Sequence, residues 1–171
     1  NHYNEPLEQK EGKLRGRGVA MGFWRNNTGP ASCIAVVTPA GTVNLTEGSV
    51  DIGGSRTAIA QQFAEVLGIP VEDVNPQIGD TDTIGYTSVT GGSGVAFKSG
   101  WAAFEAAQHV KSQLIDRAAL VWDTDPNEIE FGNGVASHKS DPELSLTFKE
   151  LAAGSNGTGG PIVGSAGVNP T

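Results

Sequence analysis

Residues 92–99, GSGVAFKS, differ in a single position from the phosphate-binding loop G-x-x-x-x-G-K-[ST]. Lys98 and Ser99 stand where that loop needs them, but Phe97 replaces the second glycine. That glycine adopts a positive φ, which a phenylalanine does poorly. A phosphate loop also follows an apolar strand, whereas the preceding residues, GDTDTIGYTS, are polar. A P-loop-like nucleotide-binding domain therefore stays open only as an alternative.

Glycine–serine turns occur twice before helical periodicity. Residues 50–57, VDIGGSRT, pass through Gly53-Gly54-Ser55, and residues 88–97, SVTGGSGVAF, pass through Thr90-Gly91-Gly92-Ser93. Backbone N–H groups at a helix start are unpaired, glycine lets a ligand approach them, and Ser or Thr adds a hydroxyl. One such turn is typical of an ordinary capped helix. Two in one small domain predict a site for a pyrophosphate or another anionic, polar cofactor.

The sequence gives little support for a metal site or for nucleophilic catalysis. Asp80 and Asp82 open DTDTIG as a calcium loop would, but Gly91 stands where that loop requires glutamate. An Asx turn with solvated carboxylates is the preferred interpretation. Cys33, the single cysteine, lies in the apolar run ASCIAVV and is expected to be a buried structural thiol. No metal site and no catalytic residue is predicted within the chain.

Length and charge restrict the class of protein. The chain has 171 residues, enough for one domain with a real core, and a formal net charge of −8. The acidic balance argues against nucleic acid and anionic membranes as partners. No apolar run approaches the ~20 residues of a membrane span, and no secretory signal is visible. We therefore expect a cytoplasmic protein.

The elements that must position the two turns follow from periodicity and turn residues. The expected order is βββαβαββα, with strands at 18–26, 31–39 and 42–52, a helix within 54–70, a short strand from 74, a long helix from Ser93 or Ser99 to Val121, a hairpin at 128–138 and a helix within 145–155. Antiparallel strands with two long helices predict an α+β fold, a two-layer sandwich of mostly antiparallel strands.

Caps and apolar stripes define these helices. Ser55 is expected to be the N-cap of the first helix and Gly68 its C-terminal stop, and Thr147 with Glu150 forms a capping box for the last. The long helix is expected to bury one apolar stripe. Its members are Trp101, Phe104, Ala107, Val110, Leu114 and Ala118.

The chain is expected to divide into three parts. Residues 1–16 are polar and form an arm, and residues 17–153 form the folded domain. Residues 154–171 are rich in glycine and lack periodicity, which is typical of a tail or a linker to a missing segment. The chain is therefore expected to be a piece of a longer polypeptide.

An ordered series of short motifs covers roughly residues 16–138. Its pieces are an acidic residue and a glycine turn at Asp51–Ser55, a helix ending in L-G-I-P at Gln62–Pro70, a DT loop at Asp80-Thr81, T-x-x-S at Thr90–Ser93, and G-x-A at Gly100–Ala102. This series resembles the large, molybdenum-binding subunit of the xanthine dehydrogenase/aldehyde oxidase family.

The resemblance implies where a cofactor would lie. In that family the two turns contact the pyranopterin of the molybdenum cofactor. Carried over to this sequence, the contact residues are Ile52, Gly53, Gly54, Ser55, Thr90, Gly92, Ser93 and Val95. The cofactor, in bacterial members often the cytosine dinucleotide form, hydroxylates a heterocycle or aldehyde with oxygen from water. Implied partners are the remainder of the molybdenum subunit, a 2Fe-2S protein, an FAD protein and a small-molecule substrate.

Two departures from the family pattern leave an alternative open. Gly54 stands where the turn usually has glutamine, and Val95 where a serine is often found, so two polar contacts are missing. The catalytic glutamate of the family lies in a downstream motif that this chain lacks, so the isolated chain is expected to be inactive. The alternative function is a non-catalytic assembly domain that has lost the cofactor.

Overall fold

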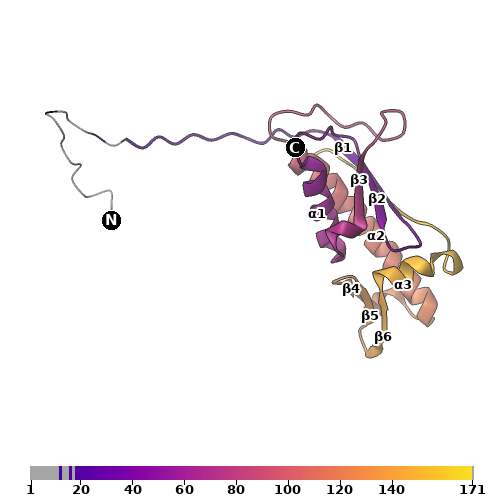
Figure 1. Cartoon of the computed structure of the whole chain (residues 1–171). Helices are drawn as coiled ribbons and strands as arrows, with labels where there is room; N and C mark the ends of the chain where they lie inside the picture. The colour runs from indigo at the N-terminus through magenta and orange to yellow at the C-terminus, as the bar shows by residue number, and fades with distance from the viewer. Residues whose placement is uncertain (1–11, 13–15, 17, 171) are drawn as a thin grey trace.

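A computed structural model of the chain describes residues 12, 16 and 18–170. The predicted N-terminal arm, residues 1–16, lies almost entirely outside the described residues. Helices and strands form two sheets and a helical layer, as expected for an α+β fold (Figure 1).

The larger sheet has four strands in the order β3-β2-β1-β7. These are β1 (Ala31–Val37), β2 (Val43–Glu47), β3 (Val74–Ile78) and β7 (Ile162–Val168). Strand β1 is antiparallel to both β2 and β7, and β2 is parallel to β3. Gly41, at φ +77°, makes the tight β1–β2 turn predicted at residues 39–42.

Two helices cover one face of this sheet (Figure 1). Helix α1 (Ser55–Leu67) ends at Gly68, whose left-handed conformation (φ +66°) confirms the predicted C-terminal stop. Helix α2 (Val95–Trp122) packs on α1, β1 and β7. The close approach of α2 follows from its small residues, because an alanine keeps the helix backbone near its neighbours. Its fully buried alanines are Ala102, Ala103, Ala106, Ala107 and Ala118.

A smaller antiparallel sheet lies beside the C-terminal half of α2 (Figure 1). It consists of β4 (Ile129–Gly132), β5 (Val135–His138) and β6 (Asp141–Thr147). The β4–β5 hairpin turns at Asn133-Gly134, both with positive φ, as predicted. Helix α3 (Phe148–Ala153) begins with the predicted capping box of Thr147 and Glu150.

The first expected strand, residues 18–26, is not formed. Within the described part of the chain, residues 18–30 form neither helix nor strand. The apolar alternation is present, but nothing described covers it, since the side chains of Val19, Met21 and Phe23 are exposed. The strand expected at 42–52 is also shorter and ends at Glu47.

The C-terminal segment differs most from expectation. Residues 154–171, expected to be an aperiodic tail or linker, contain β7, which pairs with β1 from Ala31↔Val168 to Val37↔Ile162. The glycines of this strand interrupt the alternation of apolar and polar residues from which a strand is predicted. At Gly164 the space is needed for packing, because an added Cβ would lie 2.6 Å from Val110 Cγ2 and even closer to the carbonyl oxygen of Ala106.

Two members of the predicted α2 stripe lie on the wrong side. Trp101 and Phe104 are 46% and 42% exposed, whereas the alanines, Val110 and Leu114 are buried. Trp101 stacks edge-on against Phe97, with ring centroids 5.8 Å apart. These aromatic rings line an apolar groove of about 830 Å³ between α1 and α2. The prediction failed because a run of alanines gives the buried face little hydrophobic weight.

Candidate functional site

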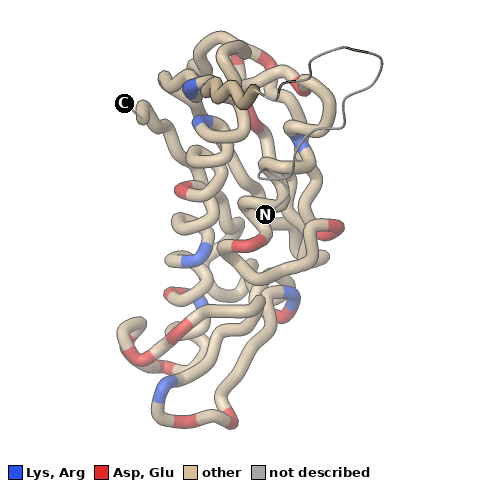
Figure 2. The backbone as a smooth tube through the Cα atoms, turned by 90° about the vertical axis from the view of Figure 1, so that its left-hand side faces the viewer, with Lys and Arg blue, Asp and Glu red and all other residues tan. Residues whose placement is uncertain are grey.

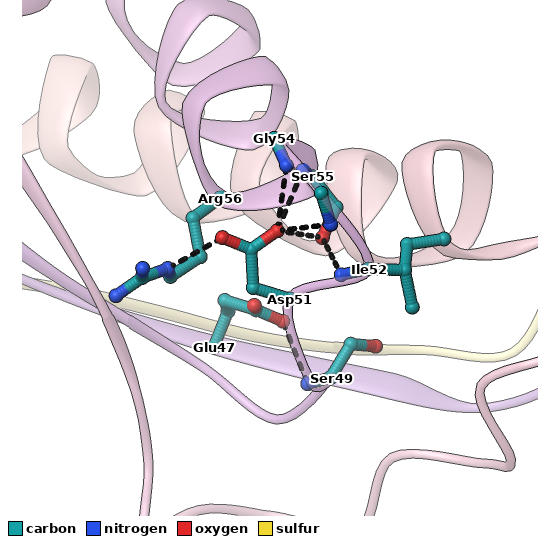
Figure 3. A network of polar contacts seen from close by, with 8 residues as sticks. Glu47, Ser49, Asp51, Ile52, Gly54, Ser55 and Arg56 are labelled. Atoms are coloured by element: carbon teal, nitrogen blue, oxygen red, sulfur yellow. Dashed lines mark hydrogen bonds and ion pairs between the residues drawn. The ribbon is translucent and has the colours of Figure 1, made fainter.

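The first glycine–serine turn is organised by Asp51 (Figure 3). Its Oδ1 accepts hydrogen bonds from the backbone N–H of Gly53 (3.1 Å), Gly54 (2.9 Å) and Ser55 (3.0 Å), and from Ser55 Oγ (3.0 Å). Its Oδ2 accepts from Arg56 Nε at 3.0 Å. The Arg56 hydrogen bond, supported by Ser55 and the turn amides, holds the pKa of Asp51 well below its usual range.

This arrangement corrects two expectations about the first turn. Gly54, not Ser55, is the N-cap residue, and Ser55 Oγ instead accepts a hydrogen bond from the N–H of Ile52 at 3.2 Å. The amides of the turn are not free for an external anion, because the Asp51 carboxylate occupies them. Asp51 is a residue that the sequence alone left without a role; an aspartate shortly before a helix start was the available signal.

The glycines of the first turn leave its outer face open. Gly53 and Gly54 have φ values of +102° and +98°, which a side chain would strain. A Cβ built on either glycine meets no heavy atom within 4 Å. Ile52 beside them is exposed, whereas Ser55 is buried. The turn therefore presents bare main chain, against which a flat ring can pack.

The second turn precedes α2 and has a different chemistry. Gly92 and Ser93 have φ values of +58° and +59°, and both are exposed. Gly94 is the N-cap residue, and no side chain accepts a hydrogen bond from the first turn of α2 among the described residues. The positive end of a 28-residue helix thus lies without an internal counter-charge beside the exposed Ser93.

Asn27 fixes the shape of the second turn. Its N–H donates to the carbonyl of Gly92 at 2.7 Å. An added Cβ on Gly92 would lie 2.6 Å from Asn27 Cβ, and one on Gly94 would meet the Asn27 carbonyl oxygen. Gly92 is therefore required by the side chain of Asn27 and Gly94 by its main chain, so the segment before β1 packs against the second turn.

Three contacts link the chain around the two turns. Ser49, just before the first turn, and Ser99, in α2, lie with their hydroxyl oxygens 2.7 Å apart. Gly48 packs directly against the side chain of Thr87, which leads into the second turn. Gln62 Nε2 of α1 donates to the carbonyl of Ala96 at 3.3 Å. The twin turns predicted from the sequence thus belong to one region of the surface.

Lys98 removes the support for the phosphate-loop alternative. Its side chain is completely buried. Nζ donates to Ser88 O (3.0 Å), Ser88 Oγ (2.6 Å) and Val89 O (2.6 Å). Burial lowers the pKa of this ammonium. Lys98 fastens the loop that leads to the second turn and does not reach a phosphate.

Glu47 lies buried beneath the first turn (Figure 3). Its Oε2 accepts from the N–H of Ser49 at 2.7 Å, while Oε1 has no partner among the described residues. Burial raises the pKa of Glu47, and the nearby Asp51 adds to the effect. Glu47 pairs across the sheet with Cys33. Cys33 is buried, as predicted, and burial raises the pKa of its thiol to about 12.

The aspartate loop is an Asx turn, as predicted. Asp80 Oδ1 accepts from the N–H of Asp82 at 2.9 Å. Across the described residues, no group of three or more His, Cys, Asp or Glu side chains could hold a metal ion. In the view of Figure 2, basic positions are scattered among acidic ones. No helix in the described residues is long and apolar enough to cross a membrane.

Fold and site together define an α+β domain with two glycine turns at the starts of two packed helices. Comparison with known proteins identifies the family of this domain. The sequence model of the molybdopterin cofactor-binding domain matches residues 2–167. The chain therefore belongs to the molybdopterin-binding domain family, and it resembles the molybdenum-binding subunits of xanthine dehydrogenase/aldehyde oxidase-type oxidoreductases.

Individual relatives agree with this assignment. The chain is 29% identical over 151 residues to the aldehyde oxidoreductase molybdenum-binding subunit PaoC of Escherichia coli K12, covering 87% of this chain and 20% of the relative. It is 31% identical over 156 residues to the putative xanthine dehydrogenase molybdenum-binding subunit XdhA of the same strain, covering 85% and 20%. The solved Cu,Mo-CO dehydrogenase superposes with a TM-score of 0.77 at 29% identity, covering 82% of this chain and 18% of that one. The chain thus spans about a fifth of the length of these relatives.

Proposed function

We propose that the two turns hold the pyranopterin of a molybdenum cofactor. The residues assigned to it are Ile52, Gly53, Gly54, Ser55, Thr90, Gly92, Ser93 and Val95. The observation that carries the proposal is the pair of positive-φ glycine turns, flanked by the buried Ser49–Ser99 hydrogen bond, with an open face at Gly53 and Gly54.

The two turns are proposed to bind different parts of the cofactor. The Asp51 carboxylate already occupies the amides of the first turn, so an anion is disfavoured there and a neutral ring edge is favoured. The α2 N-terminus at the second turn has no such counter-charge and suits phosphate. We therefore assign the phosphate or pyrophosphate of the cofactor, in its proposed cytosine dinucleotide form, to the Thr90–Val95 side.

The reaction belongs to a longer assembly. When bound, the cofactor supplies oxo-transfer hydroxylation with oxygen from water, and the protein supplies orientation and electrostatics. We propose a hydroxylase or dehydrogenase acting on a heterocycle or an aldehyde. Its catalytic glutamate lies outside this chain, and 2Fe-2S and FAD partners remove the electrons. The 171-residue chain alone is proposed to be inactive, and the cofactor-binding unit, expected at 17–153, extends to β7.

A second candidate function rests on Val95. Its side chain is 2% exposed and points into the core, so Val95 offers the cofactor only its main chain and cannot replace the polar contact of a serine. Together with Gly54, this favours an assembly domain that keeps the fold without the cofactor.

A charge change at Ser93 separates the two functions. Ser93 is exposed and already has φ +59°, a conformation that Asp and Asn both tolerate. In the assembled enzyme, Ser93→Asp should lose molybdenum and nucleotide, because its carboxylate repels phosphate. Ser93→Asn is the matched control, because asparagine has the shape of aspartate without its charge. This variant should keep both molybdenum and nucleotide. If a folded Ser93→Asp complex keeps its molybdenum, the proposed cofactor site is wrong.

A further inference from the structure

Residues 18–24, GVAMGFW, form an extended segment with a strand-like pattern. Val19, Met21 and Phe23 alternate with small residues, and their side chains are 83%, 96% and 94% exposed. Period-two alternation of this kind places large apolar side chains on one side of an extended chain. The segment carries no charge, although the chain as a whole has a net charge of −8. Such a surface is costly in water and typical of an interface.

Residues 18–24 pair with no strand of the described domain. Strand β1, which follows directly, already pairs with β2 on one side and β7 on the other. At one outer edge, β3 carries Pro76, which has no N–H to donate. In Figure 1 the segment leaves the body of the domain as an extended trace. Within the described residues the segment is therefore an unpaired extended chain, and β7 is the other outer strand of the sheet.

The residues that follow this segment contact the second turn. Phe23, Trp24, Arg25 and Asn27 line a shallow hollow together with Gly92. Asn27 binds the Gly92 carbonyl, and a few residues later the carbonyl of Pro30 accepts from the N–H of Ser88 at 2.8 Å. Whatever fixes residues 18–24 also fixes the main chain that holds the second turn.

We propose that residues 18–24 are a docking strand, which adds by β-augmentation to an edge strand in the remainder of the molybdenum subunit. The proposal rests on the proposed function. The partner is inferred from the length of the relatives. This chain corresponds to about 20% of relatives such as PaoC and XdhA, so in those proteins the domain is joined to a much larger polypeptide. Backbone hydrogen bonds supply the pairing, and pockets for Val19, Met21 and Phe23 supply the specificity. Docking also positions Asn27 and, through it, the second turn.

Hydrogen exchange tests the docking strand. We would compare amide exchange of residues 18–24 in the assembled molybdenum enzyme and in the 171-residue chain. The expected result is slowing by at least about 100-fold in the assembly, because paired strand amides exchange only on opening. Fast exchange in the intact enzyme overturns the proposal. Protection in the isolated chain that rises with its concentration also overturns it, since the partner would then be a second copy.

Two substitutions make the test specific. Phe23→Lys in the assembled enzyme should restore fast exchange at 18–24, whereas Leu120→Lys, at a 65% exposed site on α2, should leave it slow. Equal protection in both variants contradicts the proposal. Molybdenum content, measured on the same samples, separates this inference from the proposed function. A molybdenum-free assembly with a protected strand refutes only the cofactor site, and a molybdenum-loaded assembly with an unprotected strand refutes only the docking strand.

Discussion

Replacing Gly164 by alanine should weaken the docking of β7 on α2. The new Cβ would lie 2.6 Å from Val110 Cγ2 and would press on the carbonyl oxygen of Ala106. The carbonyl belongs to the helix backbone, so it cannot rotate away, and either β7 or α2 must move. Overpacking of this kind costs about 1–3 kcal/mol. For a chain of this size, 2 kcal/mol corresponds to a fall in Tm of roughly 4–8 °C.

Gly167→Ala is the matched control on the same strand. A Cβ at Gly167 meets no heavy atom within 4 Å, and the residue is exposed. The added methyl group restricts the unfolded chain, so the control should be neutral or more stable by about 0.4–1 kcal/mol. Urea denaturation followed by tryptophan fluorescence compares the two variants. Equal stability of Gly164→Ala and Gly167→Ala would refute the packing of β7 against α2.

Four further predictions concern Glu47, Asp51, Lys98 and nucleotide binding. Glu47→Gln should be increasingly more stable than wild type as pH rises above 4.5, the ordinary carboxyl value, because the raised pKa of Glu47 makes its ionisation oppose folding; a difference independent of pH in thermal unfolding would contradict this. Asp51→Asn should lose stability at neutral pH, and the loss should shrink as pH falls through and below 3.8, because the lowered pKa of Asp51 stabilises the fold only when it is ionised. Lys98→Met should cost about 1–3 kcal/mol by leaving loop carbonyls unpaired, and millimolar MgATP should leave the Tm of the wild type unchanged; an upward shift would restore the nucleotide alternative.

The sequence predicted those parts of the fold that local chemistry decides. Gly68 and the Thr147–Glu150 capping box are read from single residue types at helix ends, and the structure confirms both. The Asn133-Gly134 hairpin turn was likewise predicted from its residue types alone, and the structure confirms it. Strand β7 escaped detection because Gly164 is selected by the approach of α2, which no local pattern shows.

In the site, too, the features that depend on loop conformation or on contacts distant in sequence could not be predicted. The twin turns were visible as glycine–serine pairs, and the hydrogen bond between Ser49 and Ser99 links the segments next to them. The role of Asp51 was missed, because a carboxylate that satisfies several turn amides depends on a loop conformation that spacing alone does not specify. The apolar alternation at residues 18–26 predicted a strand for which the described domain has no partner.

The most direct test of the central claim is the metal and nucleotide content of the native assembly that contains this chain. The complex would be purified, analysed for molybdenum, and treated with acid to release any nucleotide. We expect about one molybdenum per copy of this domain together with CMP or a similar nucleotide, because the cofactor is proposed to be held by the two turns. A folded, complete assembly that contains neither would contradict the account, and Gly54 and Val95 would then mark a domain that serves assembly alone.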